Sequence, residues 1–360
     1  MTVNESSIHR ISAFELTELY ETKALSPVEV TKEALSRIDT FNNTVNAYCM
    51  IDSEPALAAA KESEARWVRG KPKGLTDGVP VSVKDIVLTK GHIVRRGSLT
   101  TSENAPDLDD CPAVARLREH GAVIIGRTTT PEHGWKGLAD SPLTGITRNP
   151  WDTSKTPGGS SGGAAVSASL GMAPLNIGTD GGGSVRIPSA FTGVFGFKGT
   201  FGRVPVYPPS AMGTLSHLGP ITRTVKDAAM MMNIMTLPDA RDASALPYNK
   251  LDYFGAFKLG VANLSIAFSP DLGYADVDSE VAEIVAKGVK VFEDQGALID
   301  VVNPGFEDPK EIFDAHWNLG AARLVDRVPE KRRAEMDPGL LCIADRGRKL
   351  TLNNHADAVD

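Results

Sequence analysis

Cysteine is scarce in this chain, which has three cysteines among 360 residues, far apart in sequence and without a C-x-x-C pair. Neither a disulfide framework nor a zinc knuckle is indicated, and a reducing compartment is expected. The seven histidines are scattered, and none belongs to an H-E-x-x-H or comparable ligand pair. The sequence therefore gives no reason to expect a metal ion.

Long apolar runs and an excess of basic residues are also absent. No stretch approaches the roughly 18 apolar residues of a spanning helix, and the N-terminus lacks a basic start followed by an apolar segment. The formal net charge of −7 disfavours non-specific attraction to nucleic acid or to anionic membranes. We therefore expect a cytoplasmic protein that binds neither. The oligomeric state stays open, a homodimer included.

What the chain has is the composition of an ordinary globular protein, 41% hydrophobic and 23% charged. Helices are predicted at about residues 10–65, where Ser12 with Glu15 and Ser26 with Glu29 each fit a capping box. Length alone allows one large domain or two smaller ones.

Strands and helices alternate after this N-terminal region. The predicted elements are a strand at residues 79–83, a helix at 112–120, a strand at 122–126, a strand at 258–262, a helix with apolar residues from Val281 to Phe292, and a strand at 298–301. This alternation predicts an α/β fold with a mixed, mostly parallel central sheet.

The segment 156–202 is rich in glycine and serine, and its composition alone is compatible with a flexible linker. Its apolar stretches at 164–170 and 174–177 instead predict a packed helix and a strand. Two serines then lie on glycine-rich turns, Ser160 in GGSSGG and Ser184 after GTDGGG. Successive backbone N–H groups in such turns can point into one pocket, as an oxyanion hole requires.

Rival readings of these turns are a phosphate-binding loop, a dinucleotide fingerprint and a hydrolase elbow. The patterns G-x-x-x-x-G-K-[ST] and G-x-G-x-x-G are missing from these turns, and G-x-S-x-G is missing around Ser184. Nucleotide binding is therefore not predicted.

The run TPGGSSGGAAVSASLGMAPLNIGTDGGGSVRIPSAFTGVFGFKGTFGRVP, at residues 156–205, resembles the signature region of the amidase-signature family. The upstream motif GVPVSVKD, at 78–85, resembles the strand that bears the catalytic lysine of that family. The resemblance extends from about residue 10 to the end, with a signature core at about 75–235. It implies a single α/β/α sandwich and no cofactor.

The resemblance also implies the site residues. Ser184 would be the nucleophile, Ser160 a bridging serine after a cis peptide bond, and Lys84 the base behind it. The backbone N–H groups of the nucleophile loop would form the oxyanion hole, from Gly181, Gly182, Gly183 and Ser184.

The chemistry needs these residue types. A serine hydroxyl is a poor nucleophile unless a base removes its proton. A lysine serves as that base only when neutral, so burial must lower the pKa of Lys84 far below its ordinary value of about 10.4. Ser160 would then relay the proton from Ser184 to Lys84 and return it to the departing nitrogen.

Simpler roles remain for several of these residues. Lys84 could be an exposed strand-end lysine paired with Asp85, and Ser160 and Ser161 could be helix caps. Asp180 and Arg186 suit an ion pair that shapes the nucleophile loop. The loop at 130–135 could line the substrate pocket or belong to core and surface, and it is not assigned to the site.

The predicted function is hydrolysis of a C–N amide bond in a small-molecule amide, giving a carboxylate and ammonia or an amine. The alternatives are a glutaminase-like subunit of an amidotransferase and a non-catalytic member of the family. The sequence does not reveal which aliphatic, aryl, urea-derived, hydrazide or ester substrate is cleaved.

The last residues, 353–360, read as part of an amphipathic helix without a glycine stop or a basic last turn. Chains of the family usually continue well past this point. The resemblance therefore implies that the C-terminal part of the family fold lies outside this sequence.

Overall fold

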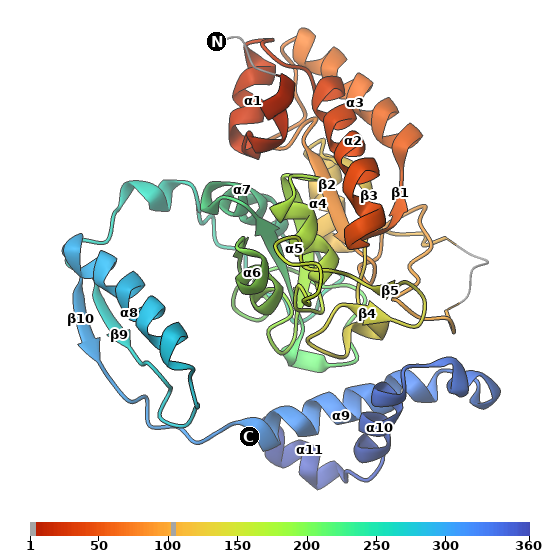
Figure 1. Cartoon of the computed structure of the whole chain (residues 1–360), viewed down its shortest axis with the longest axis vertical. Coiled ribbons are helices and arrows are strands. Elements are labelled where there is room, and N and C mark those ends of the chain that lie inside the picture. Colours follow the sequence, from red (N-terminus) through yellow and green to blue (C-terminus); the bar gives the residue numbers. More distant parts are fainter. Residues whose placement is uncertain (1–4, 102–105) are drawn as a thin grey trace. The chain divides into compact units, whose positions relative to one another are not determined.

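The structure is a computed structural model that describes residues 5–101 and 106–360. The chain forms two compact units (Figure 1). The first runs up to Leu251 and includes Asn318–Lys349, and the second comprises Asp252–Trp317 and Leu350–Asp360. The signature core expected at about 75–235 lies in the first unit.

A six-stranded mixed sheet forms the centre of the first unit. Its strands, in spatial order, are β1 (Tyr48–Ile51), β3 (Val123–Thr128), β2 (Pro80–Lys84), β6 (Leu175–Asp180), β8 (His217–Thr222) and β7 (Phe195–Gly196). Adjacent strands β3, β2 and β6 are parallel, and β1, β8 and β7 join through antiparallel pairs. The predicted α/β fold with a mixed central sheet is confirmed. The expectation that this sheet is mostly parallel is wrong, because two of its strand pairs are parallel and three are antiparallel.

Helices cover this sheet. They are α1 (Ala13–Glu21), α2 (Pro27–Val45), α3 (Ser53–Val68), α4 (Pro112–Glu119), α5 (Gly162–Ser169), α6 (Arg186–Thr192) and α7 (Val225–Met235). Helix α10 (Pro338–Gly347) also belongs to the first unit. Both predicted capping boxes are present, at the starts of α1 and α2. Helices α2, α3 and α5 share a hydrophobic core with β3, in which Ile38, Ile125 and Val166 are fully buried.

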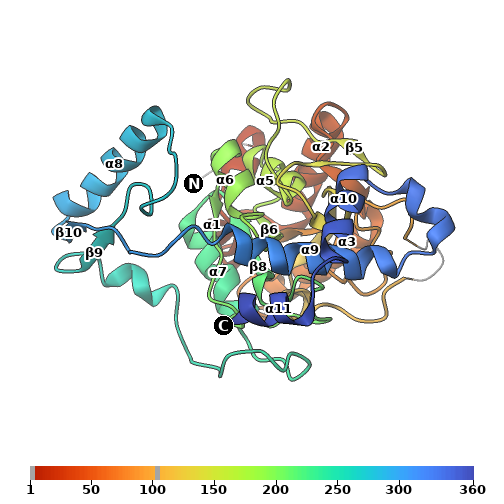
Figure 2. The same cartoon turned by 90° about the horizontal axis from the view of Figure 1, so that it is seen from below.

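Helix α5 brings the first glycine-rich turn to the sheet. It contacts β6 and β8, which are labelled beside it in Figure 2, and Figure 1 shows α5 from another side. Its sequence, GGAAVSAS, consists mainly of small residues, and a Cβ at Gly163 would overlap the carbonyl oxygen of Ala47. This close approach places Ser160 and Ser161, just before α5, near the end of β2. The linker reading of this segment is therefore wrong.

The second unit contains a parallel pair of strands, β9 (Ser265–Phe268) and β10 (Leu298–Val301), with α8 (Ser279–Asp294) between them in sequence. Helix α11 (Leu352–Val359) also belongs to it, and the boundary between the units falls within α9 (Lys310–Asp326). The predicted helix and the predicted strand at 298–301 are confirmed. No helix in the described residues has the length and apolar character needed to cross a membrane.

The strand predicted at 258–262 is wrong by several residues. Residues Gly255–Lys258 form a short 3-10 helix, and the strand begins at Ser265. The physical reason is Gly260, whose φ of +64° interrupts an extended backbone. Apolar composition alone did not reveal that turn.

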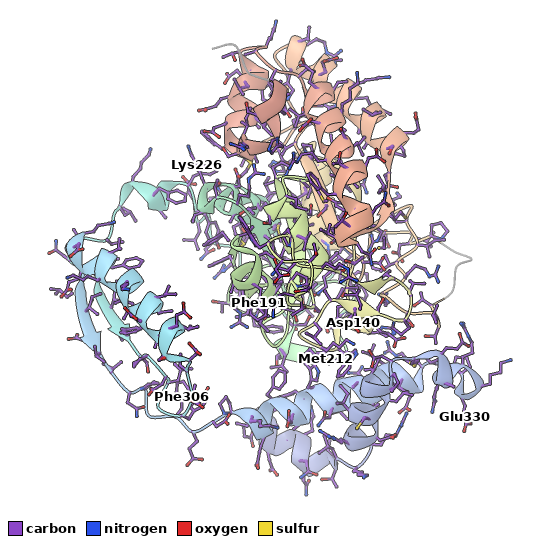
Figure 3. The ribbon with its side chains drawn as sticks, viewed as in Figure 1. Asp140, Phe191, Met212, Lys226, Phe306 and Glu330 are labelled. Carbon is purple, nitrogen blue, oxygen red and sulfur yellow. The ribbon has the colours of Figure 1, made fainter. Side chains whose placement is uncertain are left out.

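The segment Asn318–Lys349 is anchored to the loops beside the sheet. Lys136 Nζ lies 2.8 Å from Asp337 Oδ2 and 2.7 Å from Asp140 Oδ2 (Asp140 is labelled in Figure 3). Trp135 packs against the apolar cluster that contains Leu340. Nearby, the short strands β4 (Asp140–Ser141) and β5 (Gly145–Ile146) form an antiparallel pair.

Candidate active site

The last residue of β2 is a lysine whose side chain is completely buried. Lys84 is 0% exposed, and its Nζ lies 2.6 Å from Ser160 Oγ, 2.8 Å from Thr179 Oγ1 and 3.0 Å from Ser161 Oγ. Burial lowers the pKa of Lys84 well below its ordinary value, and the negative charge of Asp180 only partly opposes this effect. The amine is therefore suited to accept a proton from a hydroxyl.

Pairing of Lys84 with Asp85 is not what the structure shows. Asp85 Oδ1 accepts a hydrogen bond from Arg127 Nε at 2.9 Å, and both side chains are buried. Arg127 also donates to the carbonyl oxygen of Lys84 at 3.2 Å. The buried ion pair thus supports the backbone of the lysine while leaving its amine to the hydroxyls.

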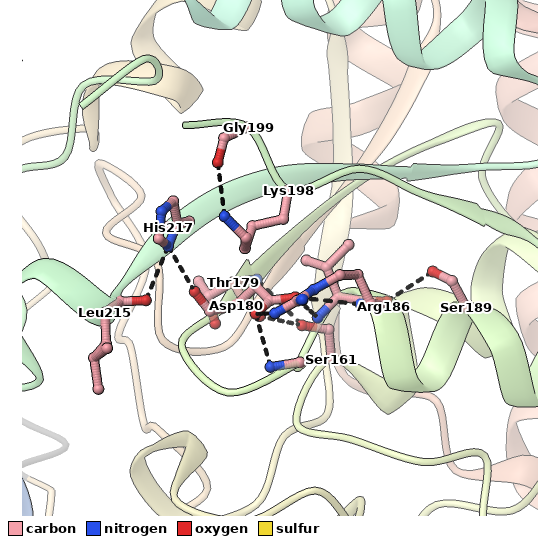
Figure 4. Close-up of polar contacts among 11 residues, drawn as sticks. Ser161, Thr179, Asp180, Arg186, Ser189, Lys198, Gly199, Leu215 and His217 are labelled. Atoms are coloured by element: carbon pink, nitrogen blue, oxygen red, sulfur yellow. Dashed lines mark hydrogen bonds and ion pairs between the residues drawn. The ribbon is translucent and has the colours of Figure 1, made fainter. Parts of the chain in front are cut away.

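The two serines before α5 have different hydrogen bonds. Ser161 Oγ accepts from the Thr179 N–H and donates to the Thr179 carbonyl oxygen, both at 3.1 Å (Figure 4). Its single proton is therefore already used. Among the described residues, the Ser160 hydroxyl has Lys84 as its hydrogen-bond partner and no other. Ser160 is thus the serine that has a proton to exchange with the amine.

The helix-cap reading of these serines is wrong. Ser161 occupies the N-cap position of α5, but its side chain makes no capping hydrogen bond because it faces Lys84 and Thr179. The peptide bond between Gly159 and Ser160 is cis, as the resemblance implies.

A buried carboxylate organises the loop that carries Ser184. Asp180, at the end of β6, is 1% exposed and accepts backbone hydrogen bonds from Gly183 at 2.8 Å, Val185 at 3.1 Å and Arg186 at 3.3 Å. The Arg186 guanidinium donates two more, at 2.9 and 2.8 Å, so the predicted ion pair is confirmed (Figure 4). Burial alone would raise the pKa of Asp180, but these hydrogen bonds lower it to about 2.

The backbone N–H groups of this loop are not equivalent. The Gly183 N–H donates to Asp180, so in this arrangement it is not available to an oxyanion, which corrects the expectation for Gly183. Within the described part of the chain, the N–H groups of Gly181, Gly182 and Ser184 have no acceptor. These three can therefore donate to a bound group.

The structure brings the two serine turns together through the backbone. The Ser161 N–H donates to the Ser184 carbonyl oxygen at 3.1 Å, and Ser184 is 6% exposed. No hydrogen bond joins Ser184 Oγ to Ser160 or Lys84 among the described residues. Such contacts often form only when a substrate is bound, so their absence here does not disqualify Ser184.

A cavity of about 210 Å³ lies beside this group of hydroxyls. Thr179, whose hydroxyl contacts Lys84, lines it, and so do His133 and Met212 (Met212 is labelled in Figure 3). Burial lowers the pKa of His133 to about 4, so its ring is neutral near pH 7. The residues of the loop at 130–135 therefore differ in their surroundings: His133 lines the cavity, and Trp135 packs against an apolar cluster.

Comparison with known proteins identifies the family. The family model described as Amidase matches residues 29–346. This chain belongs to the amidase family. Its relatives include an acylamidase of Rhodococcus erythropolis, which is 35% identical over 352 residues, covering 97% of this chain and 74% of that protein.

A second amidase-family relative is one of the subunits of the glutamyl-tRNA(Gln) amidotransferase of Carboxydothermus hydrogenoformans. It is 34% identical over 297 residues, and the match covers 82% of this chain and 61% of that protein. Among solved structures, a bacterial aryl acylamidase of the amidase signature family has a TM-score of 0.91 and 31% identity, with 98% of this chain and 75% of that chain covered. The chain thus spans part of the length of these relatives and is an amidase-type hydrolase of C–N bonds.

Two residues at this amidase-family site have no counterpart among the sequence predictions. Thr179 hydrogen-bonds to Lys84 and Ser161, and its sequence signal was its position just before the glycine-rich turn of Ser184. His217 Nδ1 lies 2.9 Å from the Leu215 carbonyl oxygen and 3.3 Å from that of Asp180 (Figure 4). Carbonyls only accept, so Nδ1 carries the proton. The sequence offered no sign of this, because it depends on the antiparallel pairing of β6 with β8.

Proposed function

We propose that this chain hydrolyses the C–N bond of a small-molecule amide through an acyl-enzyme on Ser184. The observation that carries the proposal is the completely buried Lys84 amine, 2.6 Å from the hydroxyl of Ser160 and surrounded by hydroxyl groups. A buried lysine with a lowered pKa is a base near neutral pH, and a serine beside it is the first link of a proton relay. A purely structural lysine would more commonly have a carboxylate partner.

In the first step Ser184 Oγ attacks the amide carbonyl carbon and a C–O bond forms. The Ser184 proton passes to Ser160 Oγ, while the Ser160 proton passes to the Lys84 amine. The negative charge that develops on the carbonyl oxygen is stabilised by the backbone N–H groups of Gly181, Gly182 and Ser184. Because Asp180 fixes this loop before substrate arrives, these donors need little reorganisation.

In the second step the C–N bond breaks. The proton on Lys84 returns through Ser160 to the departing nitrogen, which leaves as ammonia or an amine. A water molecule then attacks the ester carbonyl carbon and gives one proton through Ser160 to Lys84. The C–O bond to Ser184 breaks, the proton on Lys84 returns through Ser160 to Ser184 Oγ, and the acid leaves as a carboxylate after its remaining proton passes to the released amine or to solvent. Protons and electrons balance over the cycle, and Lys84 ends neutral, as it began.

A fluorophosphonate probe tests the nucleophile. The wild-type chain should form one adduct, which mass spectrometry places on Ser184, and the Ser184→Ala variant should form none. Ser189→Ala is a matched control, because that serine is buried nearby on α6 and its hydroxyl donates to the Val185 carbonyl oxygen. An adduct on Ser160, or one that survives Ser184→Ala, would exclude the assignment.

A second candidate is a glutaminase-like subunit that passes ammonia to a partner. It is favoured by the 34% identity to a glutamyl-tRNA(Gln) amidotransferase component. The chain alone should release ammonia or amine from simple amides if it is a self-sufficient amidase. Activity confined to glutamine and dependent on added partner proteins would favour the second candidate instead.

A further inference from the structure

The cavity beside Thr179 has an uneven charge. Two arginines line it, Arg96 and Arg327, whereas no aspartate or glutamate does so among the described residues. His133 adds a hydrogen-bonding ring that is neutral near pH 7. Most of the remaining lining is apolar, including Val87, Leu218 and other aliphatic side chains. The cavity therefore presents positive charge within a largely apolar wall.

The backbone of Arg96 is held firmly in place. Its N–H donates to the Asp85 carbonyl oxygen at 2.9 Å, and its carbonyl oxygen accepts from the His133 N–H at 2.7 Å. The flanking Arg95 and Gly97 N–H groups donate to the Asp85 carboxylate at 3.3 and 3.4 Å. The φ of Arg96 is +58°, a conformation that is sparsely populated for residues other than glycine. Asp85, the residue after Lys84, thus fixes the backbone from which the Arg96 side chain extends.

The guanidinium of Arg96 lacks a partner, although it is half-buried. Within residues 5–101 and 106–360 it makes no hydrogen bond or ion pair. The carboxylate of Asp85 is already paired with Arg127 at 2.9 Å, and Asp107 acts on Arg96 only through space. Arg327 also has no ion-pair partner in the described chain. Such groups are most stable when an anion supplies the missing acceptors.

We propose that this cavity binds a carboxylate group of the substrate, so that the preferred substrates are amides of small dicarboxylic acids. This inference rests on the proposed amidase function and specifies its substrate class. Arg96 would grip the carboxylate with its planar fork, Arg327 would add charge at the more exposed side, and the apolar wall would contact the short carbon chain. An amino acid amide fits less well, because no lining carboxylate is present among the described residues to pair with its ammonium group.

Three amides test the proposal on the full chain: glutaramate, its neutral isostere 5-methylhexanamide, and glutamine. The wild type should cleave glutaramate with at least tenfold higher kcat/KM than either of the others. Arg96→Met should lower the ratio of glutaramate to 5-methylhexanamide roughly 10- to 100-fold, and Arg96→Lys should lower it less, since charge without the fork remains. Arg69→Met, at an exposed arginine just after α3, is the matched control and should leave the ratio unchanged.

Binding of glutarate to the inactive Ser184→Ala variant, measured by calorimetry, separates this inference from the catalytic proposal. Glutarate should bind, and the added Arg96→Met change should weaken it by a similar factor. An unchanged substrate ratio in Arg96→Met, or no preference for glutaramate in the wild type, overturns the inference while Ser184 labelling can still succeed. If Arg96→Met lowers kcat/KM equally for glutaramate and 5-methylhexanamide and also lowers the melting temperature, Arg96 serves as a counter-charge for Asp107. That result would also overturn the inference.

Discussion

Replacing Asp180 by asparagine should destabilise the protein by a predictable amount. The pKa of this carboxyl falls from an ordinary 3.8 to about 2 in the folded chain, because five hydrogen bonds to its oxygens favour the charged form. At 1.36 kcal/mol for each pKa unit, the folded chain favours the carboxylate over the carboxyl by about 2 kcal/mol more than the unfolded chain does. Asparagine resembles the neutral carboxyl in shape, so Asp180→Asn should lower the free energy of unfolding by about 2 kcal/mol at pH 7.

The pH dependence follows from the sign of the shift. A lowered carboxyl pKa contributes stability above the unfolded value of 3.8, and this contribution is lost as the pH falls through about 2. The difference between wild type and variant should therefore be constant from pH 7 to pH 5 and should shrink between pH 4 and pH 2. Urea unfolding followed by tryptophan fluorescence measures it at each pH.

Asp152→Asn is the matched control for this experiment. Asp152 also has a lowered pKa, from hydrogen bonds to Ser154, but it is fully exposed, so water can replace those bonds. Its replacement should leave the unfolding midpoint nearly unchanged. Equal midpoints for wild type and Asp180→Asn at pH 7, or a difference that persists unchanged at pH 2, would refute the assigned role of the Asp180 carboxylate.

Three further predictions concern Lys84 and the two serines beside it. The rate of amide hydrolysis should rise with pH as Lys84 loses its proton, because only the neutral amine is a base. Lys84→Met should abolish this rise of the rate with pH, and Lys84→Arg should not restore it. An unchanged pH profile in Lys84→Met would exclude the lysine as the base. Ser160→Ala should reduce kcat by roughly 100-fold or more, since water replaces a relay poorly. Ser161→Ala should affect the melting temperature more than Ser160→Ala does, because the Ser161 hydroxyl also binds the Thr179 backbone; a reversed order in both measurements would reverse the two roles.

The pairing of Lys84 with Ser160 was predicted through the resemblance to the amidase-signature family, and the structure gives its physical reason. Lys84 ends a buried strand, and Ser160 lies just before a helix whose small residues let it lie close to the sheet. What the sequence could not show is that Ser161 also contacts the amine, because the choice between capping α5 and facing Lys84 depends on one side-chain rotation.

Other parts of the site depend on register and on local turns. His217 lies opposite Asp180 only because β8 runs antiparallel to β6 in that register. Gly183 was expected to donate to an oxyanion, but the short return of the loop brings its N–H to the Asp180 carboxylate first. The spacing of glycines and serines in the sequence predicts where such loops occur. Which group accepts a hydrogen bond from each backbone N–H depends on the conformation of the loop.

The lining of this cavity is the part of the site that the sequence could predict least, because its residues come from segments that share no sequence pattern. Arg96 comes from the loop after β2, Met212 from the loop before β8, and Arg327 from the segment just after α9. None of these positions has the hydrophobic periodicity that predicts an element, and each arginine alone reads as a solvated surface charge. The two arginines indicate an anion-binding cavity only because the fold brings both beside Thr179, with no carboxylate among the described lining residues. The family therefore defines the bond that is cleaved, and we propose that the charge of this cavity selects the amides that reach Ser184.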